Sequence, residues 1–277
     1  MKTLHLHEPS ALARHPPEDA WARSFRHPIF VVADGVTLEP DRHGHYPDPS
    51  GAARAAQIFC QTVVREAEAR YAEFSATDVP RIFVAANAAV GELNQSAGRS
   101  KETSNFWEVD LFATTGAFVV INNHAVNWAT IGDANVFQLN RTGIITFQSP
   151  EGFARRDANL PLEWHQISQR EQKILNRKTY RNGLNAAGES IGYGVATGEA
   201  TAVPYLKAGR LTMHRDDIIF LCTDGFAPYL TRAEFRRLLA AWPNDLPEQL
   251  KSISQTWATQ DPERYGDERT LVALMME

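Results

Sequence analysis

Residues 111–147 read LFATTGAFVVINNHAVNWATIGDANVFQLNRTGIITF. Apolar runs in this stretch are separated by turn residues, and positions 140–143 have the composition of a hairpin turn. The pattern predicts a meander of antiparallel strands. Further from this block, short apolar runs at 29–33, 216–223 and 270–275 predict three more strands.

Helices are predicted on both sides of these strands. Apolar residues at positions 52, 55, 56, 59 and 63 follow the helical period, so a first helix is expected to begin near Ser50. A second is expected from Asp78, a third from a Thr231 cap to about Trp242, and a fourth over 247–259. Helices and strands therefore occur in blocks rather than in strict alternation. This favours an α+β fold with antiparallel sheets and helices on their outer faces.

Composition narrows the function classes. The 277 residues carry a net charge of −5, whereas a nucleic-acid-binding protein usually has a basic excess. Neither of the two cysteines belongs to a C-x-x-C pair, which excludes a zinc ribbon and favours a reducing, cytoplasmic setting. The apolar runs are too short for a secretory signal or a membrane span. We expect one domain over residues 1–277, with neither nucleic acid nor a membrane as partner.

Aspartates border four of the predicted strands. Asp34, Asp133 and Asp224 each follow an apolar run, in VVADG, TIGDA and LCTDG, and Asp267 comes just before the last strand. Taken one at a time, such residues are more typical of turns and helix caps. If the strand ends bring them together, however, their mutual repulsion requires cations, and all-oxygen ligands select magnesium or manganese. The pattern alone thus indicates a metal hydrolase, with the turn interpretation still open.

Six short motifs carry a resemblance to a known family. They comprise Arg14, Glu18 and Asp19 in RHPPED, Asp34-Gly35, Thr114-Thr115-Gly116, Gly132-Asp133, Asp224-Gly225, and residues 267–270. Each motif is weak by itself, but the six occur in the family's order and at plausible spacing. Along most of its length the chain therefore resembles the metal-dependent protein phosphatases, the type 2C class.

The resemblance implies a fold and an activity. The fold is a four-layer α-β-β-α sandwich of two antiparallel sheets flanked by helices. The activity is hydrolysis of phosphoserine and phosphothreonine in proteins by water that two Mn²⁺ or Mg²⁺ ions activate, with a third, weaker ion in addition. The implied partners are a phosphorylated protein substrate and an opposing serine/threonine kinase, which would place the chain in signalling.

The resemblance also implies which residues hold the metal ions. Asp34 would bridge the two ions, and Asp224 and Asp267 would complete the site of one of them. These three are the implied catalytic residues. The carbonyl of Gly35 and the carboxylate of Glu18, through water, would serve the other ion.

Three further roles follow from the same resemblance. Asp133, together with Asp224, would hold the third ion. Arg14 would bind the substrate phosphate, because a guanidinium makes two charge-assisted hydrogen bonds to such a group. Asp19 would accept a hydrogen bond from water on a metal ion.

The chain departs from the family pattern at several positions. Pro17 and Glu268 each replace an Asn, and no His, the general acid proposed for some members, follows Gly35. His43 or His45 would be a substitute, although exposed loop histidines are the more common case. Two alternatives stay open: a binding module that has lost catalysis, and a metal-dependent hydrolase of another phosphoester.

Residues at about 150–200 are expected to form the family's variable flap beside the active site. The part from 154 to 181 carries seven Arg and Lys side chains. A solvated basic helix face is the expected arrangement, and a grip on a phosphopeptide is the alternative.

Overall fold

The predicted strand meander is present in the computed structural model, which describes residues 1–12, 15–41 and 43–277. Its strands are β4 (Thr114–Asn122), β5 (Ala125–Ile131), β6 (Asn135–Leu139) and β7 (Ile145–Gln148). The expected hairpin turn joins β6 to β7, where the Gly143 N–H donates to the Asn140 carbonyl at 2.9 Å. β4 pairs with β5 and β6 pairs with β7, but the two pairs belong to different sheets.

Each of the two sheets has five strands, and all neighbouring strands run antiparallel. One sheet, called the β3 sheet below, has the order β2–β3–β4–β5–β8. Its other members are β2 (Ala20–Arg23), β3 (Ile29–Gly35) and β8 (Lys207–Thr212). The second, the β9 sheet, has the order β1–β10–β9–β6–β7. Its other members are β1 (Lys2–Glu8), β9 (Ile218–Cys222) and β10 (Arg269–Met275).

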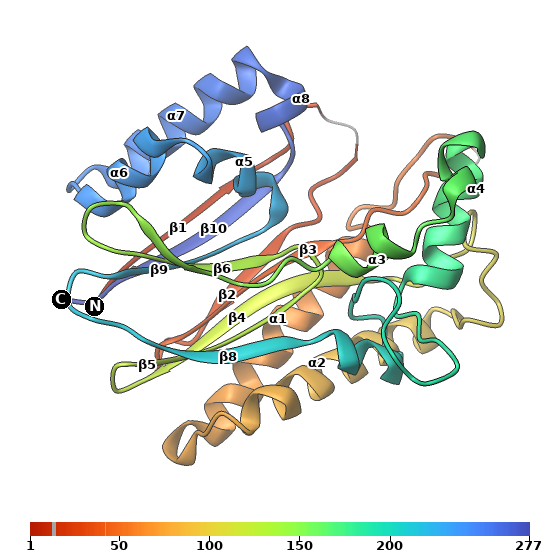
Figure 1. The fold of residues 1–277 in the computed structure, drawn as a ribbon, viewed down its shortest axis with the longest axis horizontal. Coiled ribbons are helices and arrows are strands. Elements are labelled where there is room, and N and C mark those ends of the chain that lie inside the picture. The colour runs from red at the N-terminus through yellow and green to blue at the C-terminus, as the bar shows by residue number, and fades with distance from the viewer. Residues whose placement is uncertain (13–14, 42) are drawn as a thin grey trace.

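Helices cover the outer face of each sheet, so the predicted four-layer α-β-β-α sandwich is confirmed (Figure 1). On the β3 sheet lie α1 (Gly51–Arg70) and α2 (Asp78–Ser96). On the β9 sheet lie α5 (Ala227–Leu230), α6 (Ala233–Ala241), α7 (Leu246–Gln260) and α8 (Pro262–Tyr265). As the sequence predicts, Ser50 caps α1, and its hydroxyl accepts the Ala53 N–H at 3.1 Å. None of the helices in the described ranges is both long and apolar enough to cross a membrane.

The expected cap at Thr231 is wrong. α5 already follows the turn at Asp224, and Thr231 comes at the end of that helix, where its hydroxyl donates to the Pro228 carbonyl at 2.7 Å. Arg232 takes the position before α6 and makes no side-chain cap hydrogen bond. A Thr ahead of an apolar helix satisfies the sequence rule for a cap, but here its hydroxyl is used by the preceding turn of helix.

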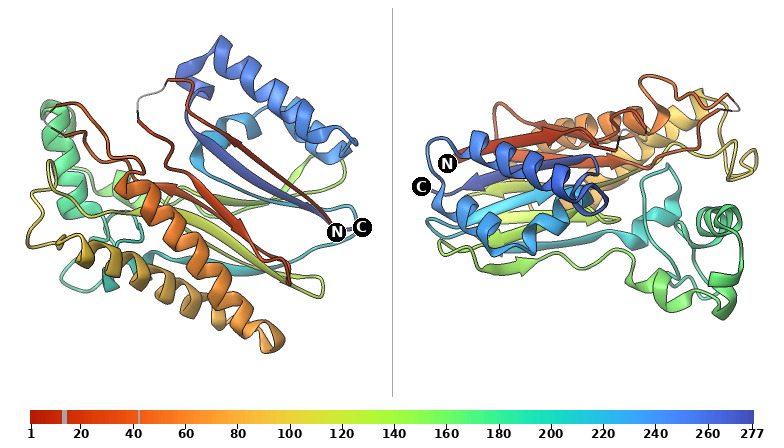
Figure 2. Two further views of the ribbon diagram at one scale, coloured as in Figure 1. Left: turned by 180° about the vertical axis from the view of Figure 1, so that it is seen from behind. Right: turned by 90° about the horizontal axis from the view of Figure 1, so that it is seen from above.

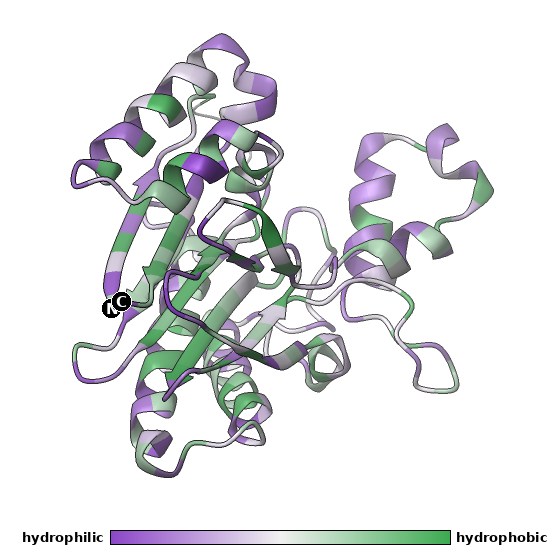
Figure 3. Cartoon of the chain, turned by 60° about the vertical axis from the view of Figure 1, so that its left-hand side comes forward, coloured by the Kyte–Doolittle hydropathy of each residue, from purple (hydrophilic) through white to green (hydrophobic). Residues whose placement is uncertain are grey.

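The space between the two sheets is filled by apolar side chains from both. Phe30, Val32 and Val119 of the β3 sheet pack with Leu221 and Val272 of the β9 sheet, and all five are buried. Figure 3 shows the same distribution as hydrophobic colour along the central strands, with hydrophilic colour on the outer sides of the helices. This inter-sheet core holds the two sheets at a constant separation, because protein interiors are close-packed.

Residues 150–200 form an irregular segment beyond one end of the sandwich (Figure 2). It contains α3 (Ala154–Asn159), a 3₁₀ turn (Leu162–Gln166), α4 (Gln169–Leu175) and a π-helical turn (Asn176–Tyr180). Further 3₁₀ turns lie at Tyr71–Glu73, Ala200–Tyr205 and Asp224–Phe226.

A buried ion pair anchors this segment. The Arg181 guanidinium donates to both oxygens of Asp110, at 2.9 and 2.7 Å, and each residue is only 2% exposed. Arg177 approaches the same carboxylate at 3.3 Å and donates to the Thr37 carbonyl at 3.2 Å. The expectation of a solvated basic face is therefore wrong for Arg177 and Arg181, because an acidic partner distant in sequence makes their burial possible.

Candidate active site

Asp34 lies at the end of the apolar strand β3, and Gly35 follows it against helix α1. A Cβ on Gly35 would lie 2.6 Å from the backbone of Ala52, so only glycine allows this close approach of strand and helix. The Thr114 hydroxyl donates to the Asp34 carbonyl at 2.7 Å and fixes the strand end from the neighbouring strand. The Asp34 side chain is thereby held at the edge of the β3 sheet.

Strand pairing brings the other three aspartates to the same end of the sandwich. Cys222, the last residue of β9, is opposite both Asn135 and Leu271. One residue separates Asp224 from the end of β9. One residue likewise separates Asp133 from the start of β6 and Asp267 from the start of β10. Antiparallel pairing thus gathers residues from three distant parts of the chain at one edge of the β9 sheet.

The four aspartates line a single cavity of about 320 Å³. Asp34 comes from the β3 sheet, Asp224 and Asp267 from the β9 sheet, and Asp133 from the connection between the two. The other described residues of the lining are His15, Gly35, Val36, Thr37, Thr115, Phe153, Arg156, Tyr193, Val195 and Glu268. The structure therefore brings together aspartates that the sequence separates by up to 233 positions, from 34 to 267.

Mutual repulsion dominates the electrostatics of this cavity. Burial raises the pKa of Asp34 well above its ordinary value, and the charges of Asp19, Asp224, Asp133 and Glu268 raise it further. Burial, together with Asp133 and Asp267, raises the pKa of Asp224 to about 7. Ionisation of Asp34 and Asp224 is therefore unfavourable unless positive charge is supplied.

The oxygen ligands and their repulsion fit hard divalent cations. Asp133 Oδ1 is buried and accepts no hydrogen bond from any residue that the structure describes, so this oxygen is left without a partner for its lone pairs. Among the same residues, three possible ligand atoms lie within 4.8 Å of one another only in the group of His7, Asp19 and Glu268. No three of the four aspartates come that close together in the described structure. The aspartate oxygens are thus distributed around the cavity. This arrangement suits two ions whose shells are completed by water more than one ion enclosed by protein.

Glu18 and Asp19 precede β2 beside the cavity. Glu18 is 1% exposed, and its carboxylate accepts hydrogen bonds from the hydroxyls of Ser50 and Thr37, so it faces α1 and the loop after Gly35. Asp19 accepts a hydrogen bond from the Thr223 hydroxyl at 2.9 Å. Burial, followed by the charge of Glu268, raises the pKa of Asp19 well above its ordinary value.

Other predicted positions have different outcomes. Arg14 lies outside the described residues. His43 and His45 are exposed in a turn, where their backbone N–H groups donate to Asp41 Oδ1 at 2.8 and 2.9 Å. Neither histidine lines the aspartate cavity.

Among the cavity residues that were not predicted as site residues, Glu268 and Arg156 carry a charged side chain. Glu268 uses both carboxylate oxygens to accept the backbone N–H groups of Glu18 and Asp19, at 2.7 and 3.1 Å. Arg156 of α3 reaches the cavity from the 150–200 segment, with its guanidinium carbon 4.7 Å from the centre of the Phe153 ring. Glu268 is recognisable in the sequence as a carboxylate next to Asp267. Arg156 is one of seven basic residues in its segment, and nothing in the sequence singles it out.

The stability of the metal-free protein is expected to fall as pH rises from about 4 to 7. Because the pKa of Asp224 is raised from 3.8 to about 7, the folded chain holds a proton in this range that the unfolded chain has released. Stability from this group is therefore complete below pH 4 and is lost as pH rises through 7. Urea unfolding in EDTA at several pH values measures the slope, which Asp224→Asn should make shallower. An unchanged slope in that variant would contradict the assignment to Asp224.

The chain matches proteins of known type. A model of the family described as protein phosphatase 2C matches residues 13–258. No curated protein sequence matches significantly.

Solved structures match over the whole chain. The serine/threonine phosphatase PstP/Ppp of Mycobacterium tuberculosis is 15% identical with a TM-score of 0.63, and covers 100% of this chain and 98% of its own. The PstP catalytic domain in complex with two manganese ions gives 14%, 0.65 and the same coverage. Stp1 of Staphylococcus aureus gives 16% and 0.60, covering 100% of this chain and 95% of its own. At these identities the likeness establishes the fold.

Proposed function

Since the chain belongs to the protein phosphatase 2C family, a family of serine/threonine protein phosphatases, we propose that it hydrolyses phosphoserine and phosphothreonine in proteins by a metal-dependent reaction. Its substrate would be a phosphorylated protein, and its action would oppose a serine/threonine kinase. The observation that carries the proposal is the cavity in which Asp34, Asp133, Asp224 and Asp267 converge. A protein that only binds a partner has no use for four mutually repelling carboxylates, because their repulsion costs stability.

The chain's own carboxylates would hold two Mn²⁺ or Mg²⁺ ions, as the family resemblance implies. Asp34 would contact both ions, Asp224 and Asp267 one, and the Gly35 carbonyl with Glu18, through water, the other. Asp133 with Asp224 would hold a third ion more weakly, and the unpartnered Oδ1 of Asp133 supports this role. Bound ions would neutralise the phosphate charge and lower the pKa of the attacking water.

The other wall of the cavity is suited to the phosphate. The guanidinium of Arg156 belongs to the cavity wall. Two of its nitrogens donate to the exposed Asp157 at 2.8 and 2.6 Å. A dianionic phosphate would compete well for those donors, because charge-assisted contacts to phosphate are stronger than an exposed ion pair. By its family position Arg14 would bind the same group. Phe153 and Tyr193 limit the space beside Arg156.

Arg156→Ala is expected to raise KM for a phosphothreonine peptide about tenfold or more, with a smaller change in kcat, because the lost contact is made to bound substrate as well as to the transition state. Arg156→Lys should recover part of the effect, since it keeps the charge but not the two-pronged donor. Arg170→Ala is the matched control, because Arg170 is an exposed arginine of the same segment that does not line the cavity. Equal KM values for the Arg156 and Arg170 variants would exclude Arg156 from phosphate binding.

Turnover itself tests the proposed function. The purified chain should release phosphate from a phosphothreonine peptide with Mn²⁺ and lose this activity in EDTA, since water fills much of the expected metal shell. Full activity in excess chelator would exclude the two-metal mechanism. Faster hydrolysis of nucleotides than of the peptide would favour another phosphoester as substrate. Binding of the peptide without hydrolysis at any metal concentration would favour the inactive binding module.

A further inference from the structure

A second group of possible metal ligands lies next to the aspartate cavity, where β1 pairs with β10 (Figure 1). His7 is opposite Thr270 in this pairing, and Glu268 comes just before β10. His7 Nδ1 lies 2.8 Å from Thr270 Oγ1, and its Nε2 lies 3.7 Å from Glu268 Oε1. With Asp19, these side chains offer three ligand atoms within 4.8 Å of one another.

The two ring nitrogens of His7 face different groups. Nδ1 shares a hydrogen bond with Thr270 Oγ1, and in the tautomer that carries the Nδ1 proton the Nε2 lone pair faces the Glu268 carboxylate. A cation between that lone pair and the carboxylate would bind to both. The His7 side chain is 34% exposed, so an ion has access from solvent.

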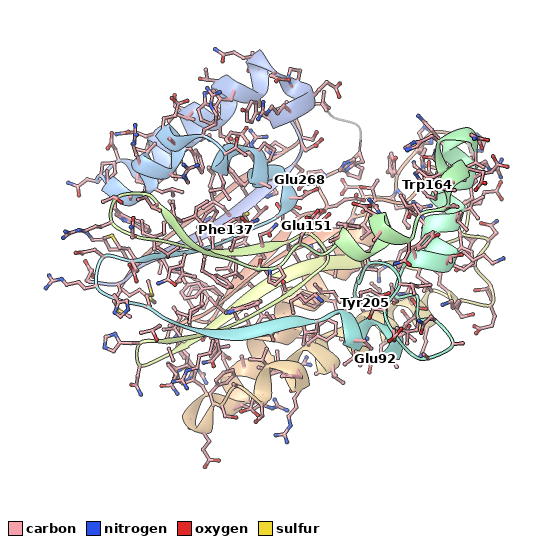
Figure 4. The ribbon with its side chains drawn as sticks, in the orientation of Figure 1. Glu92, Phe137, Glu151, Trp164, Tyr205 and Glu268 are labelled. Atoms are coloured by element: carbon pink, nitrogen blue, oxygen red, sulfur yellow. The ribbon has the colours of Figure 1, made fainter. Side chains whose placement is uncertain are left out.

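Hydrogen bonds orient the carboxylates of Glu268 and Asp19, the other two possible ligands. Glu268 is 7% exposed and is oriented by the backbone N–H groups of Glu18 and Asp19, one on each oxygen, which leaves further lone pairs free. Asp19 is oriented by the Thr223 hydroxyl. Figure 4 shows Glu268 beside the strands of the sandwich, apart from Trp164 on the 150–200 segment, although Phe153 and Arg156 of that segment line the same cavity as Glu268. The Asn expected at position 268 from the family pattern would supply no anionic ligand there.

We propose that His7, Asp19 and Glu268 form a site for one first-row transition ion, of the zinc class, beside the oxygen-only aspartate centre and with different ligands. Zinc binds both imidazole nitrogen and carboxylate oxygen, and catalytic zinc sites combine three protein ligands with a water in the fourth position. Magnesium disfavours such a set, because it prefers oxygen ligands. The site would therefore fill with zinc while the aspartates hold magnesium.

Zinc titration by calorimetry in excess Mg²⁺ tests the proposal, because Mg²⁺ occupies the oxygen-only centre and leaves the imidazole site open. The wild-type chain should bind one Zn²⁺, and His7→Gln should weaken this binding at least ~10-fold, since loss of even an outer ligand partner costs that much. His5→Gln is the matched control, because His5 lies on the same face of β1 but belongs to no such group within the described part of the chain. Neither variant alters the aspartate cavity, so the result does not depend on phosphatase activity.

A spectroscopic measurement on the wild-type chain makes the test independent of any folding defect in a variant. Zn²⁺ added in excess Mg²⁺ should shift the Nε2 resonance of His7 in ¹⁵N spectra and leave that of His5 in place. The proposal is overturned if the wild-type chain binds no Zn²⁺ under these conditions. It is also overturned if His7→Gln binds Zn²⁺ as wild type does, or if only a proton titrates at His7.

Discussion

Asp34→Asn is expected to lower kcat/KM for a phosphothreonine peptide at least ~100-fold, because the carboxylate proposed to contact both ions is lost. The same change should raise the unfolding temperature of the metal-free protein. Asn removes a charge whose ionisation is opposed by burial and by the neighbouring carboxylates, while it changes the side-chain volume little. Turnover with Mn²⁺ measures the loss of activity. Calorimetry with and without Mn²⁺ measures the change in unfolding temperature, which is expected to rise in the metal-free protein.

The combination of opposite effects distinguishes a metal ligand from a structural residue. If Asp34 only stabilised a turn, its replacement would lower the stability of the protein both with and without metal. Metal would then stabilise the variant as it does the wild type. Asp216→Asn is the matched control, because Asp216 is an exposed turn residue with φ of 65°, a conformation that Asn tolerates. If Asp34→Asn keeps the metal-induced rise in unfolding temperature, Asp34 is not a ligand. Asp224→Asn and Asp267→Asn should likewise lose activity and the metal-induced rise in unfolding temperature.

Asp110→Asn is expected to lower the free energy of unfolding by about 3–5 kcal/mol, because it leaves the Arg181 guanidinium buried without a counter-charge. Arg181 is 2% exposed, and no solvent is available to replace the lost carboxylate. Arg177 loses its 3.3 Å contact to Asp110 in the same change but keeps Glu39 at 3.7 Å. Denaturant unfolding at constant slope measures the effect, and limited proteolysis of the 150–200 segment shows whether this part opens first.

Glu234→Gln provides the comparison for an exposed ion pair. It removes the contact to Arg232 at 3.3 Å, in which both side chains are at least half exposed, and should change stability by about 0–1 kcal/mol. A similarly small change in Asp110→Asn would mean that the 150–200 segment is not held by this pair.

Local patterns were sufficient for most of the layers. The apolar runs of β3, β9 and β10 and the helical period of α1 each predict their element directly. β1 was not among the predicted strands, although its sequence KTLHLHE alternates and Leu4 and Leu6 are buried. β2 has only four residues and is a strand because β3 pairs with it, which no local pattern contains.

The aspartates of the site were predictable because strand ends are visible in a sequence. The burial of Arg181 was not, since its partner Asp110 is 71 residues away and a lone arginine in a polar stretch has the pattern of a solvated one. Arg156 and Glu268 were also missed as site residues. The place of Arg156 on the cavity wall depends on how α3 meets segments that are distant along the chain, whereas Glu268 had a local signal in its neighbour Asp267.

The inter-sheet core has a consequence for ion selection. Asp34 belongs to one sheet and Asp224 with Asp267 to the other, so the thickness of the layer that contains Val32, Val119 and Leu221 would set the gap between the carboxylates that we propose as ligands. Because packed interiors compress little, this gap resists adjustment to an ion of another radius. A bulkier residue at Val119 would widen it and shift preference from Mg²⁺ toward the larger Ca²⁺. The apolar layer would thus influence which ionic radius the site prefers, although none of its side chains is among the proposed ligands.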